Sequence, residues 1–124
     1  MTLRDSIAAA RISGPLRQPD GAAVFEFRFG ADDRTFAGHF PARPLLPGVF
    51  QLEMARAMAE WILGCPLAVR EVYKAKFMRP ILPDEIVRAD LRLSESGGTV
   101  QARADFSVAG QRAGETVLRL WRNA

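Results

Sequence analysis

The chain has 124 residues, of which 48% are hydrophobic and 25% charged, and its formal net charge is +3. These values predict one globular domain, residues 1–124, with a single core, and they exclude a disordered or collagen-like chain. No apolar run is long enough to cross a membrane, and the N-terminal apolar patch is too short and interrupted for a signal peptide. A lone cysteine, Cys65, expected as a small buried residue, favours a reducing compartment, so we expect a cytoplasmic protein.

The first third of the chain predicts a strand followed by a long loop. Residues 5–16 mix small and apolar residues and fit the start of a helix or a strand equally well. A turn signal at Gln18–Gly21 precedes alternating residues 22–30, where the phenylalanines fall on one side of a predicted strand. Residues 31–47 form a loop stiffened by three prolines. A loop of this length in a compact domain is usually functional.

A single long helix is predicted over about residues 48–63. It ends at Gly64, with Pro66 just beyond it. Apolar side chains cover most of its circumference, which predicts a buried helix. Glu53 is the exception, because it shares a stripe with Val49, Arg56 and Glu60 and could equally belong to a solvated polar face.

The rest of the chain predicts strands joined by tight turns. The expected strands are residues 68–79, 86–94, 100–108 and 113–122, and Ser96-Gly97-Gly98 and Ala109-Gly110 mark turns between them. Four consecutive hairpin-connected strands indicate an antiparallel sheet. One buried helix and a curved sheet predict an α+β fold in which the sheet wraps around the helix.

The chemistry-bearing residues gather between Gly38 and Glu53, in the segment GHFPARPLLPGVFQLE. This segment holds the only histidine of the chain, His39, and a helix that opens at Pro47-Gly48. A neutral imidazole, a carboxylate and a helix N-terminus are the groups needed to abstract a proton beside a carbonyl. As alternatives, His39 could be structural and Gly48 could simply start the helix.

The pattern GHFP–PGV–LE, with His39 and Glu53 fourteen positions apart, resembles the β-hydroxyacyl-acyl carrier protein dehydratases of the FabZ type. The stretch YKAKFMRPILPD at residues 73–84 also resembles that family, and the similarity covers roughly residues 24–120. The resemblance implies a hotdog fold, in which a sheet wraps a long helix. It implies that His39 is the base, that Glu53 is the general acid with a pKa raised by an apolar tunnel, and that the Gly48 N–H binds the thioester oxygen.

The resemblance also implies the substrate and the partners. The substrate would be a 3-hydroxyacyl group carried on phosphopantetheine, converted to a trans-2-enoyl group in fatty acid, polyketide or aryl polyene-type biosynthesis, without a metal or cofactor. The expected substrate-binding residues are Phe40 (also a candidate for core packing), Pro47, Val49, Phe50 and Met54. The expected docking residues for an acidic acyl carrier protein are Arg43, Lys74, Lys76 and Arg79, although these could form an ordinary solvated face.

In the family the site is shared across a dimer, with His39 from one chain and Glu53 from the other. We therefore expect a homodimer, a higher homo-oligomer or a heterodimer with a related dehydratase. Coenzyme A remains open as the carrier. Nucleic acid is not expected as a partner, because basic and aromatic residues are not interleaved.

Two departures from the family leave other functions open. The family commonly has Gln one turn after the glutamate, where this chain has Ala57, and the typical N-terminal helix with a His-Arg-Tyr-Pro-like segment is absent. A hotdog thioesterase is the nearest alternative enzyme, with Asp32 or Asp33 as its carboxylate. A non-catalytic partner subunit is the alternative from another class.

Overall fold

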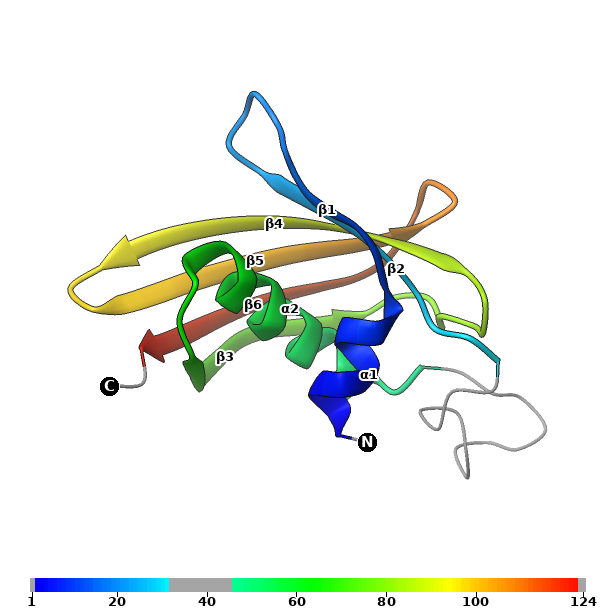
Figure 1. Cartoon of the computed structure of the whole chain (residues 1–124), viewed down its shortest axis with the longest axis horizontal. Coiled ribbons are helices and arrows are strands. Elements are labelled where there is room, and N and C mark those ends of the chain that lie inside the picture. The colour runs from blue at the N-terminus through cyan, green and yellow to red at the C-terminus, as the bar shows by residue number, and fades with distance from the viewer. Residues whose placement is uncertain (1, 32–45, 123–124) are drawn as a thin grey trace.

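One curved antiparallel sheet lies against a central helix in the computed structural model, which describes residues 2–31 and 46–122. The elements in chain order are α1 (Leu3–Ala10), β1 (Arg11–Arg17), β2 (Ala23–Arg28), α2 (Gly48–Leu63), β3 (Leu67–Phe77), β4 (Ile86–Ser96), β5 (Thr99–Val108) and β6 (Gln111–Arg122). The six strands follow the order β1-β2-β4-β5-β6-β3, and α2 lies along the inner face of the sheet (Figure 1). The predicted α+β class and the sheet around a long helix are confirmed.

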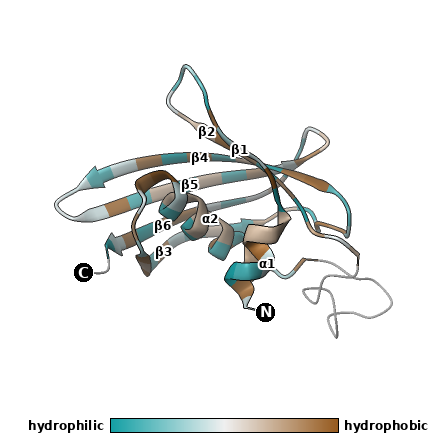
Figure 2. Ribbon diagram, viewed as in Figure 1, coloured by the Kyte–Doolittle hydropathy of each residue, from teal (hydrophilic) through white to brown (hydrophobic). Residues whose placement is uncertain are grey.

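Hydrophobic residues alternate along the strands, as expected for a sheet with one buried face (Figure 2). The inward residues predicted for β5 are all buried: Val100, Ala102, Ala104, Phe106 and Val108. On α2, Ala55 and Ala59 are fully buried. Small side chains on both surfaces let the helix backbone come close to the sheet.

The bounds of α2 agree with the sequence prediction. Gly64 ends the helix in the left-handed conformation, with a φ of 70°, and its N–H donates to the Glu60 carbonyl at 2.8 Å. At the other end Pro47 occupies the N-cap position and offers no side-chain hydrogen bond. The first-turn N–H groups of a helix lack intrahelical acceptors, so this end can accept a ligand.

Residues 5–16, which the sequence left open as a helix or a strand, contain parts of both. A capping box of Thr2 and Asp5 starts α1, which ends at Ala10, and β1 follows directly. The helix alternative for residues 5–16 therefore holds up to Ala10, and α1 carries no His-Arg-Tyr-Pro-like segment. α1 contacts α2 and contributes fully buried Ile7 to the core.

The predicted run of four hairpin-connected strands is also wrong in one respect. β4, β5 and β6 do form a meander, but β3 pairs with β6 and lies at the end of the sheet. The turn at Pro83-Asp84 therefore belongs to a connection between strands that are not neighbours. This pairing joins residues far apart in the chain, so local patterns carried no signal for it.

Glu115 on β6 is the most heavily compensated carboxylate on the sheet. Lys74 Nζ lies 2.5 Å from its Oε1, while Arg103 and Arg112 lie 2.7 and 3.5 Å from its Oε2. Lys74 first, and then the two arginines, hold the pKa of Glu115 below its usual value. A lowered folded-state pKa adds stability above the unfolded pKa, and this stability is lost as the pH falls through the folded value.

We expect Glu115→Gln to lower the free energy of unfolding at pH 7 and to reduce the further loss of stability below about pH 4. Urea denaturation at pH 7, 4 and 3 measures both effects. Glu95→Gln is the control, because Glu95 pairs with Arg122 on an exposed surface. An unchanged acid dependence in Glu115→Gln would contradict the assignment.

Candidate functional site

The N-terminus of α2 is tightly enclosed on one side by an aromatic ring. A Cβ added to Gly48 would lie 2.8 Å from Cε2 of Phe77, at the end of β3. Any larger residue would have to displace that ring. Glycine is therefore required here for close packing against the ring.

A pocket of about 190 Å³ lies beside this helix end. Its walls are held together by backbone hydrogen bonds from Leu46 N to Ile81 O (2.8 Å) and from Met78 N to Ala113 O (2.9 Å). The lining residues are Leu46, Gly48, Gln51, Phe77, Met78, Arg79, Pro80 and Ile81. The loop before α2, the helix itself and the segment after β3 thus meet at one place.

Glu53 lies on a different side of α2 and is held by Arg56. The Glu53 Oε2 atom accepts from Arg56 Nε at 3.1 Å and also from Arg56 Nη2. Arg56 is only 8% exposed, and Glu53 is half-buried. The alternative of a solvated polar face is therefore wrong for Arg56. In the described part of the chain, Glu53 forms an ion pair with Arg56 and is not surrounded by an apolar tunnel. Both contacts from Arg56 are thus made to the same oxygen, Oε2.

Arg56 also ties this side of α2 to the start of β3. Its Nη1 donates to Glu60 Oε2 and to the Leu67 carbonyl, both at 3.3 Å. The Leu67 N–H in turn donates to Glu60 Oε2 at 2.8 Å. The network fixes the rotamer of Arg56, and Arg56 in turn fixes the carboxylate of Glu53.

Gly48 and Glu53 do not converge within one chain. Five residues of α-helix separate them by about 7.5 Å along the axis and about 140° around it. His39, Phe40 and Arg43, like Asp32 and Asp33, lie outside the described residues. The structure therefore locates two of the three predicted catalytic residues and places them on different sides of α2.

The predicted substrate-binding residues have different surroundings. Pro47 is half-buried and Val49 is exposed, whereas Phe50 packs edge-on against Phe29 with ring centroids 5.9 Å apart. Met54 is fully buried in the core. Contact of these residues with a substrate stays a prediction.

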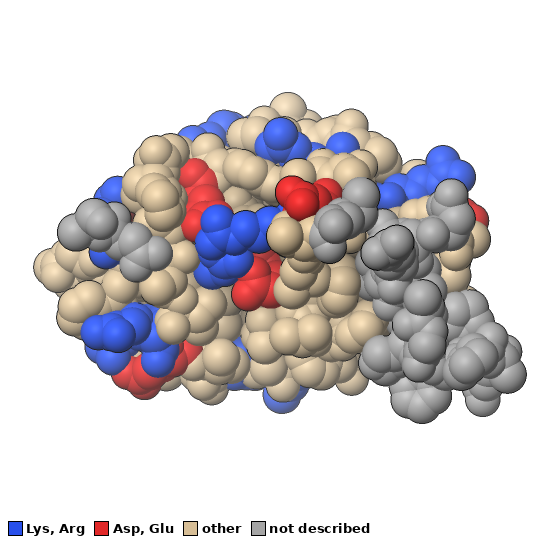
Figure 3. All heavy atoms as spheres, turned by 60° about the horizontal axis from the view of Figure 1, so that its bottom comes forward, with Lys and Arg blue, Asp and Glu red and all other residues tan. Residues whose placement is uncertain are grey.

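The predicted docking residues are largely engaged in ion pairs. Lys74 binds Glu115, and Arg79 binds Glu85 at 2.7 Å and Gln111 at 3.1 Å. The Arg79 guanidinium holds the pKa of Glu85 below its usual value. In Figure 3 acidic and basic atoms of the described residues often lie side by side. Lys76 is exposed, so it is the described member of the group most available to a partner.

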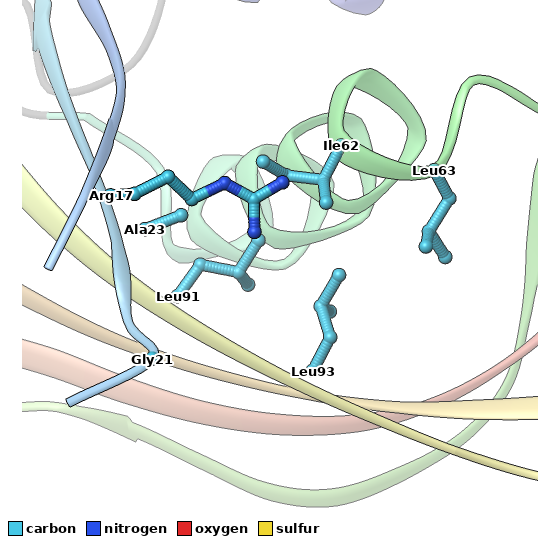
Figure 4. A pocket seen from close by; sticks show the side chains of 7 residues that line it. All are labelled: Arg17, Gly21, Ala23, Ile62, Leu63, Leu91 and Leu93. Carbon is cyan, nitrogen blue, oxygen red and sulfur yellow. The ribbon is translucent and has the colours of Figure 1, made fainter. Parts of the chain in front are cut away.

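A second pocket, of about 280 Å³, lies at the opposite end of α2. Its lining residues are Arg17, Gly21, Ala23, Ile62, Leu63, Leu91 and Leu93. In Figure 4 the Arg17 guanidinium extends over this apolar floor toward Ile62. The length of α2, about 24 Å for sixteen residues, separates it from Gly48. It is therefore not part of the site at the helix N-terminus.

Solved structures show that the fold is the hotdog fold of dehydratases and thioesterases. The dehydratase heterocomplex ApeI:P from Xenorhabdus doucetiae matches with a TM-score of 0.71 at 24% identity, over 90% of this chain and 96% of that chain. A hypothetical thioesterase from Streptococcus pneumoniae, solved with coenzyme A, matches with a TM-score of 0.67 at 9% identity, over 92% and 87% of the two chains. At these identities the likeness establishes the fold alone.

The family follows from the sequence. The ApeI-like family, described as ApeI dehydratase, matches residues 16–117. The chain therefore belongs to the ApeI-like dehydratase family, and the predicted resemblance is confirmed.

Curated relatives of this chain are 3-hydroxyacyl-[acyl-carrier-protein] dehydratases named FabZ. The Chloroflexus aggregans protein is 33% identical over 111 residues, which cover 82% of this chain and 76% of that one. The Granulibacter bethesdensis protein is 37% identical over 95 residues, or 68% of this chain and 56% of that one. The match to the Acidiphilium cryptum protein covers 55% of that protein. The chain thus spans little more than half the length of some of the relatives it matches.

Among the described residues, no helix is long and apolar enough to cross a membrane. Within the same ranges, no group of three or more histidine, cysteine, aspartate or glutamate side chains is placed to hold a metal ion. Cys65 is half-buried, and not fully buried as predicted, with Arg122 Nη1 at 3.0 Å from its sulfur.

Two residues of the site were missed by sequence reasoning. Arg56 was assigned only to a polar stripe, and its burial depends on β3, which follows in the chain. Gln51 was not singled out, although it precedes Met54, Ala55 and Met58 at helical spacings of three, four and seven. A polar residue on an otherwise apolar face was the signal that could have identified it.

We expect Arg56→Met to destabilise the protein by about 3 kcal/mol, because Glu53 and Glu60 lose their shared cation. Arg56→Lys should lose less, since it keeps the charge but not the forked geometry. Chemical denaturation measures both variants against Arg88→Met, which removes an exposed arginine paired with Asp90. Equal stability of Arg56→Met and Arg88→Met would contradict the buried network.

Proposed function

We propose that this protein dehydrates 3-hydroxyacyl thioesters carried on phosphopantetheine. The observation that carries the proposal is the uncapped N-terminus of α2 at Gly48 beside a pocket, in a chain of the dehydratase family that also presents Glu53. His39 removes a proton from the carbon beside the thioester carbonyl. The Gly48 N–H and the helix dipole stabilise the negative charge that develops on the thioester oxygen.

The second half of the reaction falls to Glu53. In this step Glu53 carries a proton on Oε1 while Oε2 accepts from Arg56, and it gives that proton to the β-hydroxyl as the carbon–oxygen bond breaks, so that water leaves and a trans-2-enoyl thioester remains. Arg56, on Oε2, orients the carboxyl group so that Oε1 meets the substrate. No electron acceptor is required, because elimination of water changes neither the oxidation state of the whole substrate nor that of the enzyme.

The site is completed by a second subunit, which the separation of Gly48 and Glu53 on α2 supports. β3 supplies a surface for that subunit: it pairs only with β6 among the described strands, which leaves its outer edge unpaired. Its large exposed side chains are Val69, Val72, Tyr73 and Phe77. A hydrophobic strand with a free edge is a common site of pairing between chains. The partner is a second copy or a related dehydratase.

The preferred carrier is acyl carrier protein, with coenzyme A as the alternative. Lys76 is exposed at the end of β3 that leads to Phe77 and the pocket, and Arg43 precedes α2 in the chain. An acidic carrier would be steered by such charges, and salt would weaken its encounter. The cytoplasmic location and the lack of a cofactor stay predictions.

Purified protein should convert a 3-hydroxyacyl-acyl carrier protein to an enoyl product, measured by enoyl absorbance or mass spectrometry. We expect His39→Ala and Glu53→Gln each to lower kcat by at least about 100-fold, because each removes a proton-transfer group. Glu26→Gln, on β2, is a control that should stay active. Full activity of both site variants would overturn the mechanism. Release of free thiol would indicate a thioesterase, and binding without conversion a non-catalytic partner subunit.

Mixing His39→Ala with Glu53→Gln tests whether the site is shared. Random exchange of subunits should make about half of the dimers mixed, and each mixed dimer holds one intact site out of two. The mixture should therefore recover about a quarter of wild-type activity. His39→Ala mixed with the His39→Ala/Glu53→Gln double variant is the control and should stay inactive. If native mass spectrometry shows mixed dimers but activity does not return, both residues act within one chain.

A further inference from the structure

Gln51 is a buried polar side chain whose oxygen takes part in no described hydrogen bond of the fold. It is 3% exposed, and its Oε1 has no hydrogen-bond partner among residues 2–31 and 46–122. Leaving a buried polar group unpaired costs about 1–3 kcal/mol, so such a group calls for an explanation. Met54 and Ala55, which follow it on the same side of α2, are fully buried and apolar. An apolar residue at position 51 would therefore pack there without that cost.

The sheet leaves room for the Gln51 carboxamide at one particular residue. Its Oε1 lies 1.9 Å from where a Cβ of Gly114 would stand, so a side chain at that position of β6 would have to displace the carboxamide. The carboxamide therefore rests on the backbone of the sheet instead of reaching water. Rotation about its last side-chain bond exchanges the oxygen and the nitrogen, so the group can offer either an acceptor or a donor.

Gln51 also lines the pocket beside Gly48, which distinguishes it from the other buried unpaired atoms, Thr116 Oγ1 and Arg119 Nε. Gln51 lies three residues after Gly48, almost one helical turn of about 5.4 Å. The pocket volume of about 190 Å³ equals roughly six water molecules of liquid. It can therefore hold a short fragment of a ligand but not a long acyl chain.

We propose that Gln51 binds the amide nearest the thioester in the carrier arm of the substrate. In a cysteamine-type arm, a sulfur and two carbons separate the thioester carbonyl from this amide, a span comparable to one helical turn. With the thioester oxygen on the Gly48 N–H, the carboxamide turns its Oε1 from Gly114 toward the pocket, where it accepts from the amide N–H. A carboxamide complements an amide in both donor and acceptor capacity. The inference rests on the proposed function, since it takes the thioester position from it.

Two small substrates isolate this hydrogen bond. One is a 3-hydroxyacyl N-acetylcysteamine thioester, and the other is its acetoxyethyl analogue, in which an ester oxygen replaces the amide N–H. We expect the wild-type protein to favour the amide substrate in kcat/KM by about fivefold to tenfold. Gln51→Met should remove this preference, because it lowers the rate with the amide substrate more than the rate with the ester analogue. A purely structural role would lower both rates equally, and this result, or a preserved preference, would overturn the inference.

Two further variants keep the inference testable if Gln51→Met does not fold. Gly114→Ala displaces the carboxamide without removing it and should also reduce the preference. Gln101→Met changes an exposed glutamine on β5 and should keep the preference for the amide substrate. If the wild-type protein converts neither these two substrates nor the acyl carrier protein substrate, the proposed function fails. NMR titration with the saturated acyl amide and ester pair then still tests Gln51, and equal affinity of the wild-type protein for the two would overturn its role.

Discussion

The close packing of α2 on the inner face of the sheet is the constraint on which the rest of the structure depends. Alanines on the helix meet small residues on the central strands, so the helix backbone approaches the sheet closely. At Gly114 the approach is so close that Gln51 occupies the space of a side chain. This contact fixes the rotation of α2 about its axis, and it thereby decides which residues face the sheet and which face outward.

The rotation of α2 divides its functional residues between two environments. Gln51 faces the sheet beside the pocket at Gly48, whereas Glu53 points away from it and is held by Arg56. The shared site that we propose would account for this division, since each chain would then offer a binding half and an acid half. The unpaired edge of β3 and its exposed apolar side chains are consistent with such an assembly. Pocket, carboxylate and edge strand are thus consequences of one packing arrangement.

Most secondary structure was predictable because its signals are local. The phenylalanines of β2, the alternation along β4 and β5 and the glycine at the end of α2 each act within a few residues. The partner of β3 was not predictable in this way, because β6 lies some forty residues further along the chain. The pairing of β3 with β6 also places Lys74 beside Glu115, which neutralises part of the basic cluster that the sequence had suggested for docking.

The sequence by itself determined the family and the bounds of α2, because motif spacing and turn chemistry are written in consecutive residues. From the same residues it predicted two half-sites within Gly38–Glu53. Only the tertiary structure decided how those residues are held. Burial of Arg56 requires the carbonyl of Leu67, and the unpaired carboxamide of Gln51 requires the bare backbone of Gly114. The environment of a side chain depends on groups brought from distant parts of the chain, and local sequence does not specify which groups these are.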